Sequence, residues 1–198
     1  MNLNKKIIIG ITGGVASGKS VVAEFFNHMD VPVINADKIG HEILRIEKIK
    51  DQIIACFGDA ILENGEINRK KLGKIVFHDM RKLHQLNAIV HPMLIKEIIT
   101  MIEHNAEPII AIDAALLLQW NMNEICDFVI LVTAPENIRI ERIVQHTHLS
   151  YEEAQDRIHS QEKFSEQDAD YVIINDGSLK KLDTRMQFIW EQITSNAS

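Results

Sequence analysis

Gly13-Gly14-Val15-Ala16-Ser17-Gly18-Lys19-Ser20 is the stretch that decides how this chain folds. It matches the pattern G-x-x-x-x-G-K-[ST], in which a glycine-rich turn directs backbone N–H groups at phosphate oxygens. The apolar run Lys6 to Thr12 precedes it as a buried strand would, and Val21 to His28 follows with helical spacing. Strand, loop and helix in this order predict a phosphate-binding loop (P-loop) in an α/β protein.

The residue types in this loop indicate which groups it binds. Lys19 is expected to reach the β- and γ-phosphates of a nucleotide, and the Ser20 hydroxyl is expected to ligate Mg²⁺. We expect nucleotide contacts from Gly14, Val15, Ala16, Ser17, Gly18, Lys19 and Ser20. The loop by itself identifies neither the nucleotide nor the reaction.

Length and composition bound the class of protein. A chain of 198 residues suits one large α/β domain with an inserted subdomain. The net charge of −7 disfavours binding to a phosphate backbone, so we expect no nucleic-acid partner. No apolar segment approaches the roughly 18 residues that span a bilayer, because Asp113 interrupts the run Ile109 to Leu118. We therefore expect a soluble, cytoplasmic protein without membrane association.

The two cysteines, Cys56 and Cys126, lie far apart in apolar surroundings. Both are interpreted as buried or half-buried thiols in a reducing compartment, because their spacing fits neither a disulfide framework nor a metal site. His146 and His148 also lack a carboxylate or thiol partner at a suitable spacing, which favours a loop over a metal site.

Five short apolar runs predict the strands of a parallel sheet. They are continuous and rich in β-branched residues, which indicates strands covered on both faces. In chain order they are Lys6 to Thr12, Val31 to Asn35, Pro108 to Asp113, Asp127 to Thr133 and Tyr171 to Asn175. Helical stretches separate them, so the predicted fold is α/β, with about five parallel strands flanked by helices.

The interval between the second and third predicted strands is unusually long. Residues 38–105 carry helical periodicity and little strand signal, with Gly58 ending one helix and Asn64-Gly65 turning the chain. Pro92 is expected to impose a boundary or a kink after His91. Because a crossover needs only one helix, we interpret this segment as an all-α insertion that covers a second substrate.

A charged helical lid is expected at about residues 139–168, where Ser150 and Glu153 form a capping box at a helix start. Insertion and lid belong to a single domain, whose core comprises residues 1–37, 106–138 and 169–198.

Asp37 stands at the carboxyl end of the second predicted strand. Ligand sites in open parallel sheets lie beyond those ends, so its carboxylate is expected to face the phosphates. There it can accept a proton from an attacking hydroxyl or hold Mg²⁺. An N-cap for a helix beginning at Lys38 is the alternative role, and the two roles are compatible.

Other polar residues have two interpretations each. Asp113 ends the third predicted strand as a Mg²⁺-assisting acid of P-loop proteins does, or it serves in a turn. Arg139 and Arg142 share a helical face where they can stabilise the charge that develops in phosphoryl transfer. For any single arginine, pairing with glutamates on an exposed surface is the simpler interpretation. His91 fits a structural histidine or a substrate contact.

Missing motifs narrow the class of nucleotide-binding protein. There is no N-K-x-D motif, since Asn175-Asp176 lacks the lysine, and no D-x-x-G follows Asp113, which disfavours a GTPase. The chain also lacks a motor core and a basic DNA surface, which disfavours a helicase. A small acidic P-loop domain with a helical insertion and an arginine-bearing lid favours a small-molecule kinase with a P-loop kinase-type sheet.

Further segments resemble those of the dephospho-CoA kinase family, in order and over nearly the whole chain. In addition to the P-loop, they are Val33-Ile34-Asn35-Ala36-Asp37, Phe57-Gly58, Ile67-Asn68-Arg69, His91-Pro92, Leu116-Leu117 and Ala169-Asp170 through Asn175. The combination of Asn35-Ala36-Asp37, Phe57-Gly58 and His91-Pro92 is the most discriminating part.

The resemblance implies transfer of a phosphoryl group from ATP to the ribose 3′-hydroxyl of dephospho-CoA. It implies Asp37 as the catalytic base, assisted by Lys19 and Arg142, and a helical insertion that holds the CoA moiety. It places Asn175 and Gly177 beside the adenine of ATP. Mg²⁺ would be held by Ser20 and, directly or through water, Asp113. The implied substrate contacts are Thr12, Asp37, His91 and Leu116.

The chain departs from the family pattern at five places. Asn35 replaces a common aspartate, Ala115 a proline, Gln119 a glutamate and His146 a lid arginine, and a basic residue is missing before Ala169. These departures affect the lid and the adenine contacts and leave Asp37 and the loop intact. Another P-loop nucleoside or nucleotide kinase, or a non-catalytic nucleotide-binding regulatory protein, stays open as an alternative, and the oligomeric state is not evident.

Overall fold

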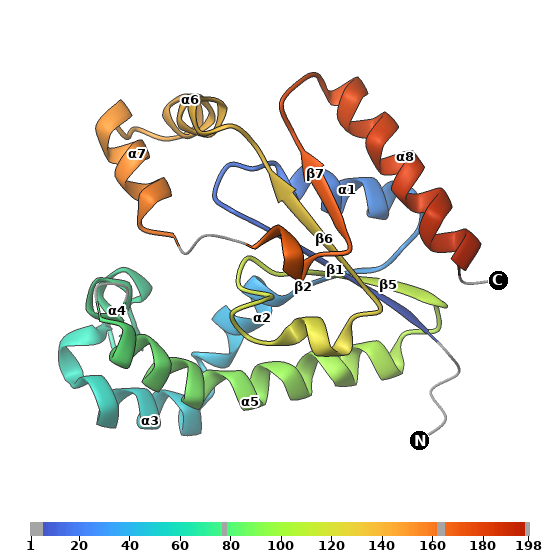
Figure 1. Ribbon diagram of the computed structural model, residues 1–198. Coiled ribbons are helices and arrows are strands. Elements are labelled where there is room, and N and C mark those ends of the chain that lie inside the picture. Colours follow the sequence, from blue (N-terminus) through green and yellow to red (C-terminus); the bar gives the residue numbers. More distant parts are fainter. Residues whose placement is uncertain (1–5, 77–78, 162–164, 197–198) are drawn as a thin grey trace. The chain divides into compact units, whose positions relative to one another are not determined.

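A computed structural model describes residues 6–76, 79–161 and 165–196 of the chain (Figure 1). Residues 162–164 of the expected lid therefore lie outside the described residues. The chain divides into two compact units. We call Met1–Ile34 with Ala106–Ser198 the core unit, and Asn35–Asn105 the helical unit.

The five expected strands form one sheet, which confirms the α/β prediction. The strands are β1 (Ile7–Gly13), β2 (Val33–Asn35), β5 (Ile109–Asp113), β6 (Phe128–Thr133) and β7 (Tyr171–Ile174), and their order is β2-β5-β1-β6-β7. β1 pairs in parallel with β5 and β6, and β6 pairs in parallel with β7. β1 therefore lies between β5 and β6, and the P-loop that follows β1 begins between these two strands.

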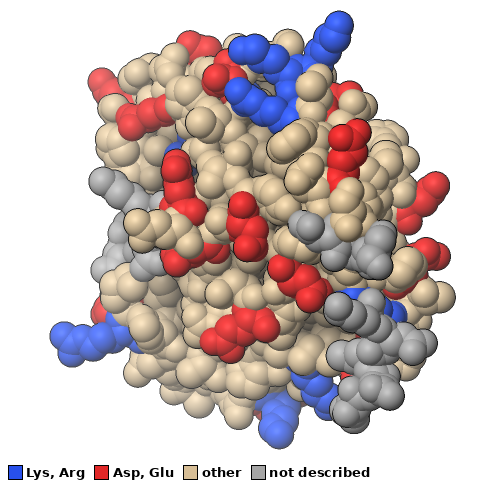
Figure 2. Space-filling model, turned by 45° about the vertical axis from the view of Figure 1, so that its right-hand side comes forward, with Lys and Arg blue, Asp and Glu red and all other residues tan. Residues whose placement is uncertain are grey.

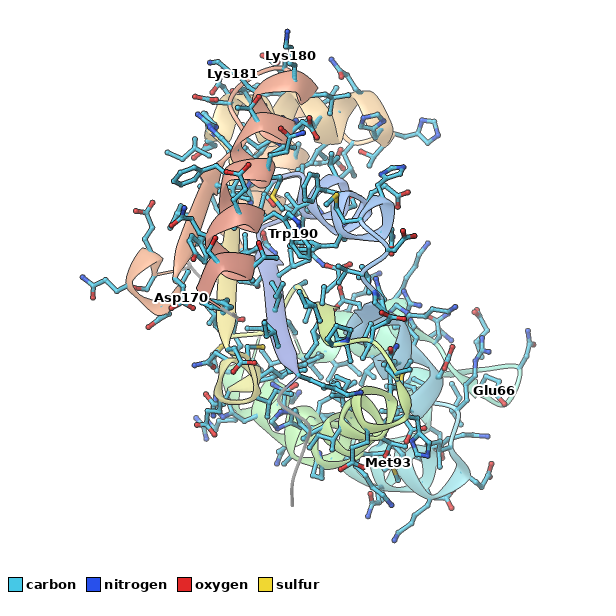
Figure 3. The ribbon with its side chains drawn as sticks, turned by 90° about the vertical axis from the view of Figure 1, so that its right-hand side faces the viewer. Glu66, Met93, Asp170, Lys180, Lys181 and Trp190 are labelled. Atoms are coloured by element: carbon cyan, nitrogen blue, oxygen red, sulfur yellow. The ribbon has the colours of Figure 1, made fainter. Side chains whose placement is uncertain are left out.

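Helices α1 (Lys19–His28) and α8 (Leu179–Asn196) pack on one face of this sheet (Figure 1). Their buried apolar residues share a cluster with Ile9 and Ile130 of the sheet. Trp190 of α8 lies beside α1 (Figure 3), with its ring centroid 6.1 Å from that of Phe26. These two helices bury the apolar side chains on one face of the strands, and burial of such surface is the main driving force of folding.

Helices α6 (Glu136–His146) and α7 (Tyr151–His159) pack against each other through a smaller cluster of buried residues. The capping box predicted at the start of α7 is present. The Ser150 hydroxyl accepts from the Glu153 N–H at 3.2 Å, and the Glu153 carboxylate accepts from the Ser150 N–H at 2.8 Å. Two 3₁₀ turns, η2 (Met122–Ile125) and η3 (Glu166–Asp168), complete the core unit.

The helical unit is built around the long helix α5 (Met80–His104), which contacts α2 (Ala36–Ile43), α3 (Glu47–Phe57) and α4 (Arg69–Val76). A 3₁₀ turn, η1 (Asp59–Ile61), follows α3. As predicted, Gly58 ends α3: its φ is +79°, and its N–H donates to the Ile54 carbonyl at 2.7 Å. Glycine adopts such a positive φ without the steric cost that a Cβ atom would add.

The prediction of an all-α insertion is wrong in one detail. The helical unit also contains a hairpin of β3 (Leu62–Glu63) and β4 (Glu66–Ile67), paired antiparallel. Asn64 and Gly65, at φ of +51° and +80°, form its two-residue turn. The sequence marked the turn, but strands of two residues are too short to give an alternating pattern.

Of the two alternatives expected at Pro92, a boundary or a kink, the boundary is wrong, because α5 continues through this residue. Proline cannot donate to the carbonyl four residues earlier and usually breaks or bends a helix. Here the affected carbonyl belongs to Ala88, an exposed residue. Val90, Leu94, Ile98 and Ile102 are buried on both sides of the proline, and this packing maintains one helix.

The two cysteines differ in environment. Cys126 is half-buried as predicted, whereas Cys56, near the end of α3, is exposed, contrary to the prediction. The Cys126 thiol donates to the Met122 carbonyl at 3.3 Å. Burial, followed by the charges of Asp127 and Asp170, raises the pKa of the Cys126 thiol to about 12.

We expect one thiol per native chain to react rapidly with a disulfide reagent at pH 8. The thiolate is the reactive form, and the raised pKa keeps Cys126 protonated until the pH approaches that value. Absorbance of the released thiolate measures the reaction, with a second equivalent expected after unfolding. The matched variant Cys56→Ser should lose the rapid phase; two rapid equivalents in the native wild type would contradict the expectation.

Acidic side chains are spread over the face shown in Figure 2, and lysine and arginine side chains gather only toward its edges. This distribution agrees with the net charge of −7. No helix among the described residues is both long enough and apolar enough to span a bilayer.

Candidate active site

The P-loop connects β1 to α1 and places its polar groups at a helix start. Gly18 is the N-cap of α1 with φ of +99°, so Lys19 and Ser20 form the first helical turn. Helix α1 thus begins earlier than the predicted Val21. The N-terminal N–H groups of a helix and its dipole favour an anion at this position.

Gly18 is required both for its backbone and for its lack of a side chain. A Cβ atom there would collide with the Asn175 side-chain amide. At a φ of +99°, a side chain would also be strained. The loop therefore allows close approach of a second segment of the core unit.

Lys19 pairs with Asp113 at the end of β5. Lys19 Nζ donates to Asp113 Oδ1, and the two side chains are only 15% and 9% exposed. The pair is therefore largely shielded from water. Opposite charges attract each other more strongly in such surroundings than at an exposed surface. Two residues separated by 94 positions, each predicted as a site residue, are brought together here.

The Ser17 hydroxyl is buried beside these groups. The residue is 1% exposed, and its Oγ has no hydrogen-bond partner among the described residues. Buried polar atoms are nearly always hydrogen-bonded in folded proteins, and exceptions are common at functional sites. Ser17 is therefore a candidate ligand contact within the loop.

Arg142 and Asn175 hold the P-loop from its carbonyl side. Arg142 Nη1 donates to the carbonyls of Ala16 and Ser17 at 3.0 and 3.2 Å, and its Nη2 donates to the Asn175 carbonyl at 3.2 Å. The Asn175 amide donates to the Ser17 carbonyl at 2.9 Å. These bonds link the loop to α6 and to the end of β7.

Arg139 and Gln161 make a second set of contacts with the loop. Arg139 Nε donates to the Val15 carbonyl at 2.9 Å. Gln161 Oε1 accepts from the Val15 N–H at 2.7 Å and from Arg139 Nη2 at 3.2 Å. Burial lowers the pKa of the Arg139 guanidinium below its ordinary value, and nearby Glu136 opposes that shift. Arg139 and Arg142 therefore contact the loop backbone, which replaces the simpler interpretation of exposed pairs with glutamates.

A cavity of about 560 Å³ lies beside the loop. The P-loop, the end of β6, α6 and the end of α7 all contribute to its walls. Lining residues that carry polar groups are Ser17, Thr133, Glu136, Arg139, His159, Gln161 and Glu166. Glu136 Oε1 lies 3.2 Å from Gln155 Nε2 and 3.1 Å from His159 Nε2, and these hydrogen bonds lower the pKa of the Glu136 carboxyl.

The remaining predicted residues of the core unit have simpler surroundings. Thr12 is fully buried, with its hydroxyl 3.4 Å from the Ala115 carbonyl that it donates to. Leu116 is half-buried, and Ser20 and Gly177 are exposed. His146 ends α6, so the histidines at 146 and 148 flank the end of a helix. Among the described residues, no cluster of three or more His, Cys, Asp or Glu side chains can hold a metal ion by itself.

In the helical unit, Asn35 and not Asp37 caps helix α2. The Asn35 side chain accepts from the Lys38 N–H at 2.8 Å, and Asp37 lies in the first turn. The capping alternative for Asp37 is therefore wrong, because α2 begins at Ala36, two residues before the start expected at Lys38. His41 lies one turn further; burial and the charge of Arg69 lower its pKa, and the charge of Asp37 raises it.

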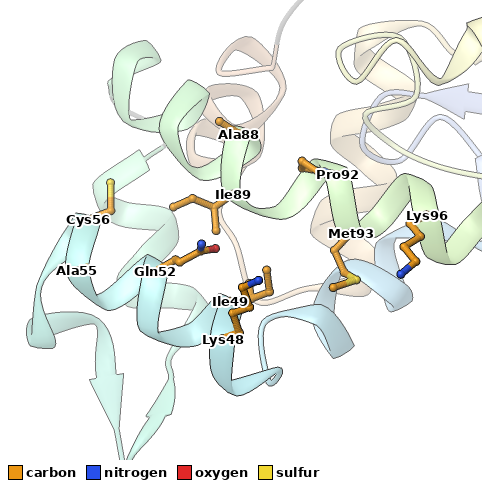
Figure 4. A pocket seen from close by; sticks show the side chains of 10 residues that line it. All are labelled: Lys48, Ile49, Gln52, Ala55, Cys56, Ala88, Ile89, Pro92, Met93 and Lys96. Atoms are coloured by element: carbon orange, nitrogen blue, oxygen red, sulfur yellow. The ribbon is translucent and has the colours of Figure 1, made fainter.

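His91 and a groove lie further along the helical unit. His91 is half-buried within α5, immediately before Pro92. A groove of about 720 Å³ runs between α3 and α5, where Ile49 and Gln52 face Ile89 and Met93 (Figure 4). Lys48 and Lys96 also line this groove.

The fold and the loop define the class of the protein. A central β1 that leads into a P-loop, in a parallel sheet flanked by helices and with a mostly helical insertion, is the architecture of a P-loop kinase. The chain belongs to the dephospho-CoA kinase family, whose model matches residues 7–181. This match confirms the resemblance found in the sequence.

Comparisons with individual proteins support this family membership. Dephospho-CoA kinase from Bacillus cereus is 38% identical over 192 residues, which cover 92% of this chain and 95% of that protein. The structure of dephospho-CoA kinase from Campylobacter jejuni matches with a TM-score of 0.67 and 26% identity, covering 96% of this chain and 98% of that one. The structure of TT1252 from Thermus thermophilus matches with a TM-score of 0.81 and 27% identity over 98% of both chains.

One residue at the loop was missed by the sequence analysis. Gln161 lies 146 positions from its partner Val15 and belongs to no recognised motif. A contact over such a separation leaves no periodic signal in a single sequence. Its place at the end of a helix in the expected lid was the one available hint.

Proposed function

We propose that the protein phosphorylates the ribose 3′-hydroxyl of dephospho-CoA with ATP and so forms coenzyme A. The observation that carries the proposal is the Lys19–Asp113 pair at the P-loop of a chain in the dephospho-CoA kinase family. Paired side chains at this position supply a fixed cation for the triphosphate and a carboxylate for its metal.

The core unit supplies the phosphate half of the proposed chemistry. The N–H groups of residues 14–20 and the start of α1 would bind the phosphates, with Lys19 at the β- and γ-phosphates. Arg142 and Asn175 support this role because they bind the carbonyls of Ala16 and Ser17 and so hold the conformation of the loop. Ser17 Oγ would gain a partner in a phosphate oxygen. The adenine would lie near Asn175 and Gly177.

The residues present fit Mg²⁺. Ser20 and Asp113 offer a hydroxyl and a carboxylate oxygen, which are donors of the type that Mg²⁺ prefers. Such sites take their other ligands from substrate phosphates and water, so a cluster of protein ligands is not required. When bound with ATP, the ion would neutralise charge on the β- and γ-phosphates.

The helical unit supplies the acceptor half. Asp37 would accept the proton of the 3′-hydroxyl or orient that hydroxyl for in-line attack on the γ-phosphorus. Its place in the first turn of α2, directly after β2, supports this role. The groove between α3 and α5 is an apolar channel with Lys48 and Lys96 on its rim, which would accept the extended part of a CoA-type substrate. His91, Thr12 and Leu116 are the further proposed contacts.

A direct assay tests the proposal. The purified chain with Mg²⁺, ATP and dephospho-CoA is expected to yield equal amounts of ADP and CoA, measured by chromatography. Pantetheine, adenosine and AMP serve as competing acceptors in the same assay. Phosphorylation of one of these in preference to dephospho-CoA would favour a different nucleotide kinase, and ATP binding without turnover on any acceptor would favour a regulatory protein.

A further inference from the structure

Gln161 presents its side-chain oxygen to two donors that belong to the phosphate-binding region. Its Oε1 accepts from the backbone N–H of Val15 at 2.7 Å, and that N–H is part of the P-loop. The same oxygen accepts from Arg139 Nη2 at 3.2 Å. A backbone N–H and a guanidinium converging on one oxygen form the type of donor set that binds a phosphate oxygen.

The residues around Gln161 allow its side chain to approach the loop closely and leave it room to move away. Gly14 permits it, since a Cβ atom at that position would lie 2.7 Å from Arg139 Nη2 and 3.2 Å from Gln161 Oε1. Gln161 follows the end of α7, and its side chain lines the 560 Å³ cavity beside the loop. A long side chain at the wall of a cavity can turn to another rotamer without disturbing the core.

Arg139 stays in place whether or not Gln161 moves. Its Nε donates to the Val15 carbonyl at 2.9 Å, so the guanidinium is anchored to the loop by a bond that Gln161 does not share. The amide oxygen of Gln161 is neutral, whereas a phosphate oxygen is charged and forms stronger hydrogen bonds with the same donors. An incoming triphosphate can therefore displace the glutamine.

We propose that Gln161 competes with the nucleotide triphosphate for the Val15 N–H and Arg139, and so sets the affinity of the P-loop for phosphate. This inference rests on the proposed function of the loop. Gln161 acts in it through the loop donors and does not contact the reacting atoms, so it is a positioning residue. An internal competitor lowers the apparent affinity for a ligand in proportion to the population of the competing contact. It also keeps the donors satisfied and ties α7 to the loop while no phosphate is bound.

Two substitutions of opposite sign test this competition. Gln161→Leu removes the acceptor at similar size and is expected to lower the dissociation constant of Mg·ATP by about threefold to tenfold, as loss of one or two hydrogen bonds implies. Gln161→Glu replaces the neutral oxygen by a charged one, which binds Arg139 more tightly, and is expected to raise the constant by a similar factor. Calorimetry of the full chain measures both. Inorganic triphosphate should give the same changes, because the competition concerns only phosphate oxygens.

The controls separate competition from other effects. Gln167, exposed in η3, provides matched variants Gln167→Leu and Gln167→Glu, which add the same groups nearby and are expected to leave both constants unchanged. Gln161→Asn withdraws the amide by one methylene and is expected to behave as Gln161→Leu, which covers the case of a poorly folding leucine variant. A purely structural role predicts weaker binding in all three Gln161 variants.

The outcomes are distinguishable. Unchanged or weaker triphosphate binding in Gln161→Leu and Gln161→Asn, with a binding wild type, overturns the competition alone. An equal effect of Gln167→Glu and Gln161→Glu overturns it too, because general charge repulsion would then explain the result. Failure of the wild type and of every variant to bind ATP or triphosphate contradicts the proposed function, and the competition with it.

Discussion

Asp37→Asn is expected to lower kcat of the ATP-dependent phosphorylation of dephospho-CoA by about 10²- to 10⁴-fold, the usual contribution of a general base. The asparagine is nearly isosteric and can still orient a hydroxyl, but it cannot accept its proton. The dissociation constant of ATP is expected to stay within about twofold of the wild-type value, because loss of a transition-state interaction need not change ground-state binding. Steady-state kinetics and calorimetry measure the two quantities.

The matched control is Asp51→Asn, an exposed aspartate on α3 in the same helical unit. It removes the same charge and is expected to leave kcat unchanged. Near-normal turnover of Asp37→Asn would remove Asp37 as the base. A loss of activity accompanied by a large loss of thermal stability would instead assign Asp37 a role in holding α2 and its neighbours.

Lys19→Met is expected to reduce kcat/KM for ATP by at least about 10³-fold. The lysine is the one P-loop side chain expected to carry a positive charge to the β- and γ-phosphates, and such charge stabilises the transition state most. The same substitution removes the Lys19 ammonium that pairs with the buried Asp113 carboxylate. We therefore also expect the free energy of unfolding to fall by about 1–3 kcal/mol.

A second substitution separates these two effects. Lys19→Met with Asp113→Asn removes the buried charge and is expected to recover most of the stability while activity stays low. Lys180→Met, at an exposed lysine near the start of α8 (Figure 3), is the matched control and should change neither quantity. Recovery of activity in the double variant would mean that Lys19 acts mainly by neutralising Asp113. Kinetics and denaturant unfolding provide the measurements.

The sheet and the P-loop could be predicted from the sequence because their signals are local. Continuous runs such as Ile109 to Asp113 can be buried only in a covered strand, and the glycine–lysine pattern determines the turn that follows β1. Lys19 and Asp113 were likewise predicted as site residues, each from its place after a strand, although their pairing was not predicted. Local pattern was enough for these features.

The features that the sequence analysis missed depend on tertiary packing or on very short elements. Pro92 was expected to end or kink a helix, and the structure rules out the end, because buried residues on both sides of it stabilise α5 as one element. Asn35 and Asp37 are equally good N-caps by residue type, and only the backbone geometry at the end of β2 selects Asn35. The contacts of Arg142, Asn175 and Gln161 with the loop join distant positions, so no spacing could have predicted them.

The exposed thiol of Cys56 gives this protein a built-in reporter of conformational change. Cys56 belongs to the helical unit, whereas both tryptophans of the chain, Trp120 and Trp190, belong to the core unit. A fluorescent acceptor attached to the native chain would label Cys56 alone, because the other thiol stays protonated. Energy transfer from indole to dye would then report whether addition of nucleotide changes the separation between Cys56 and the tryptophans, without any engineered residue.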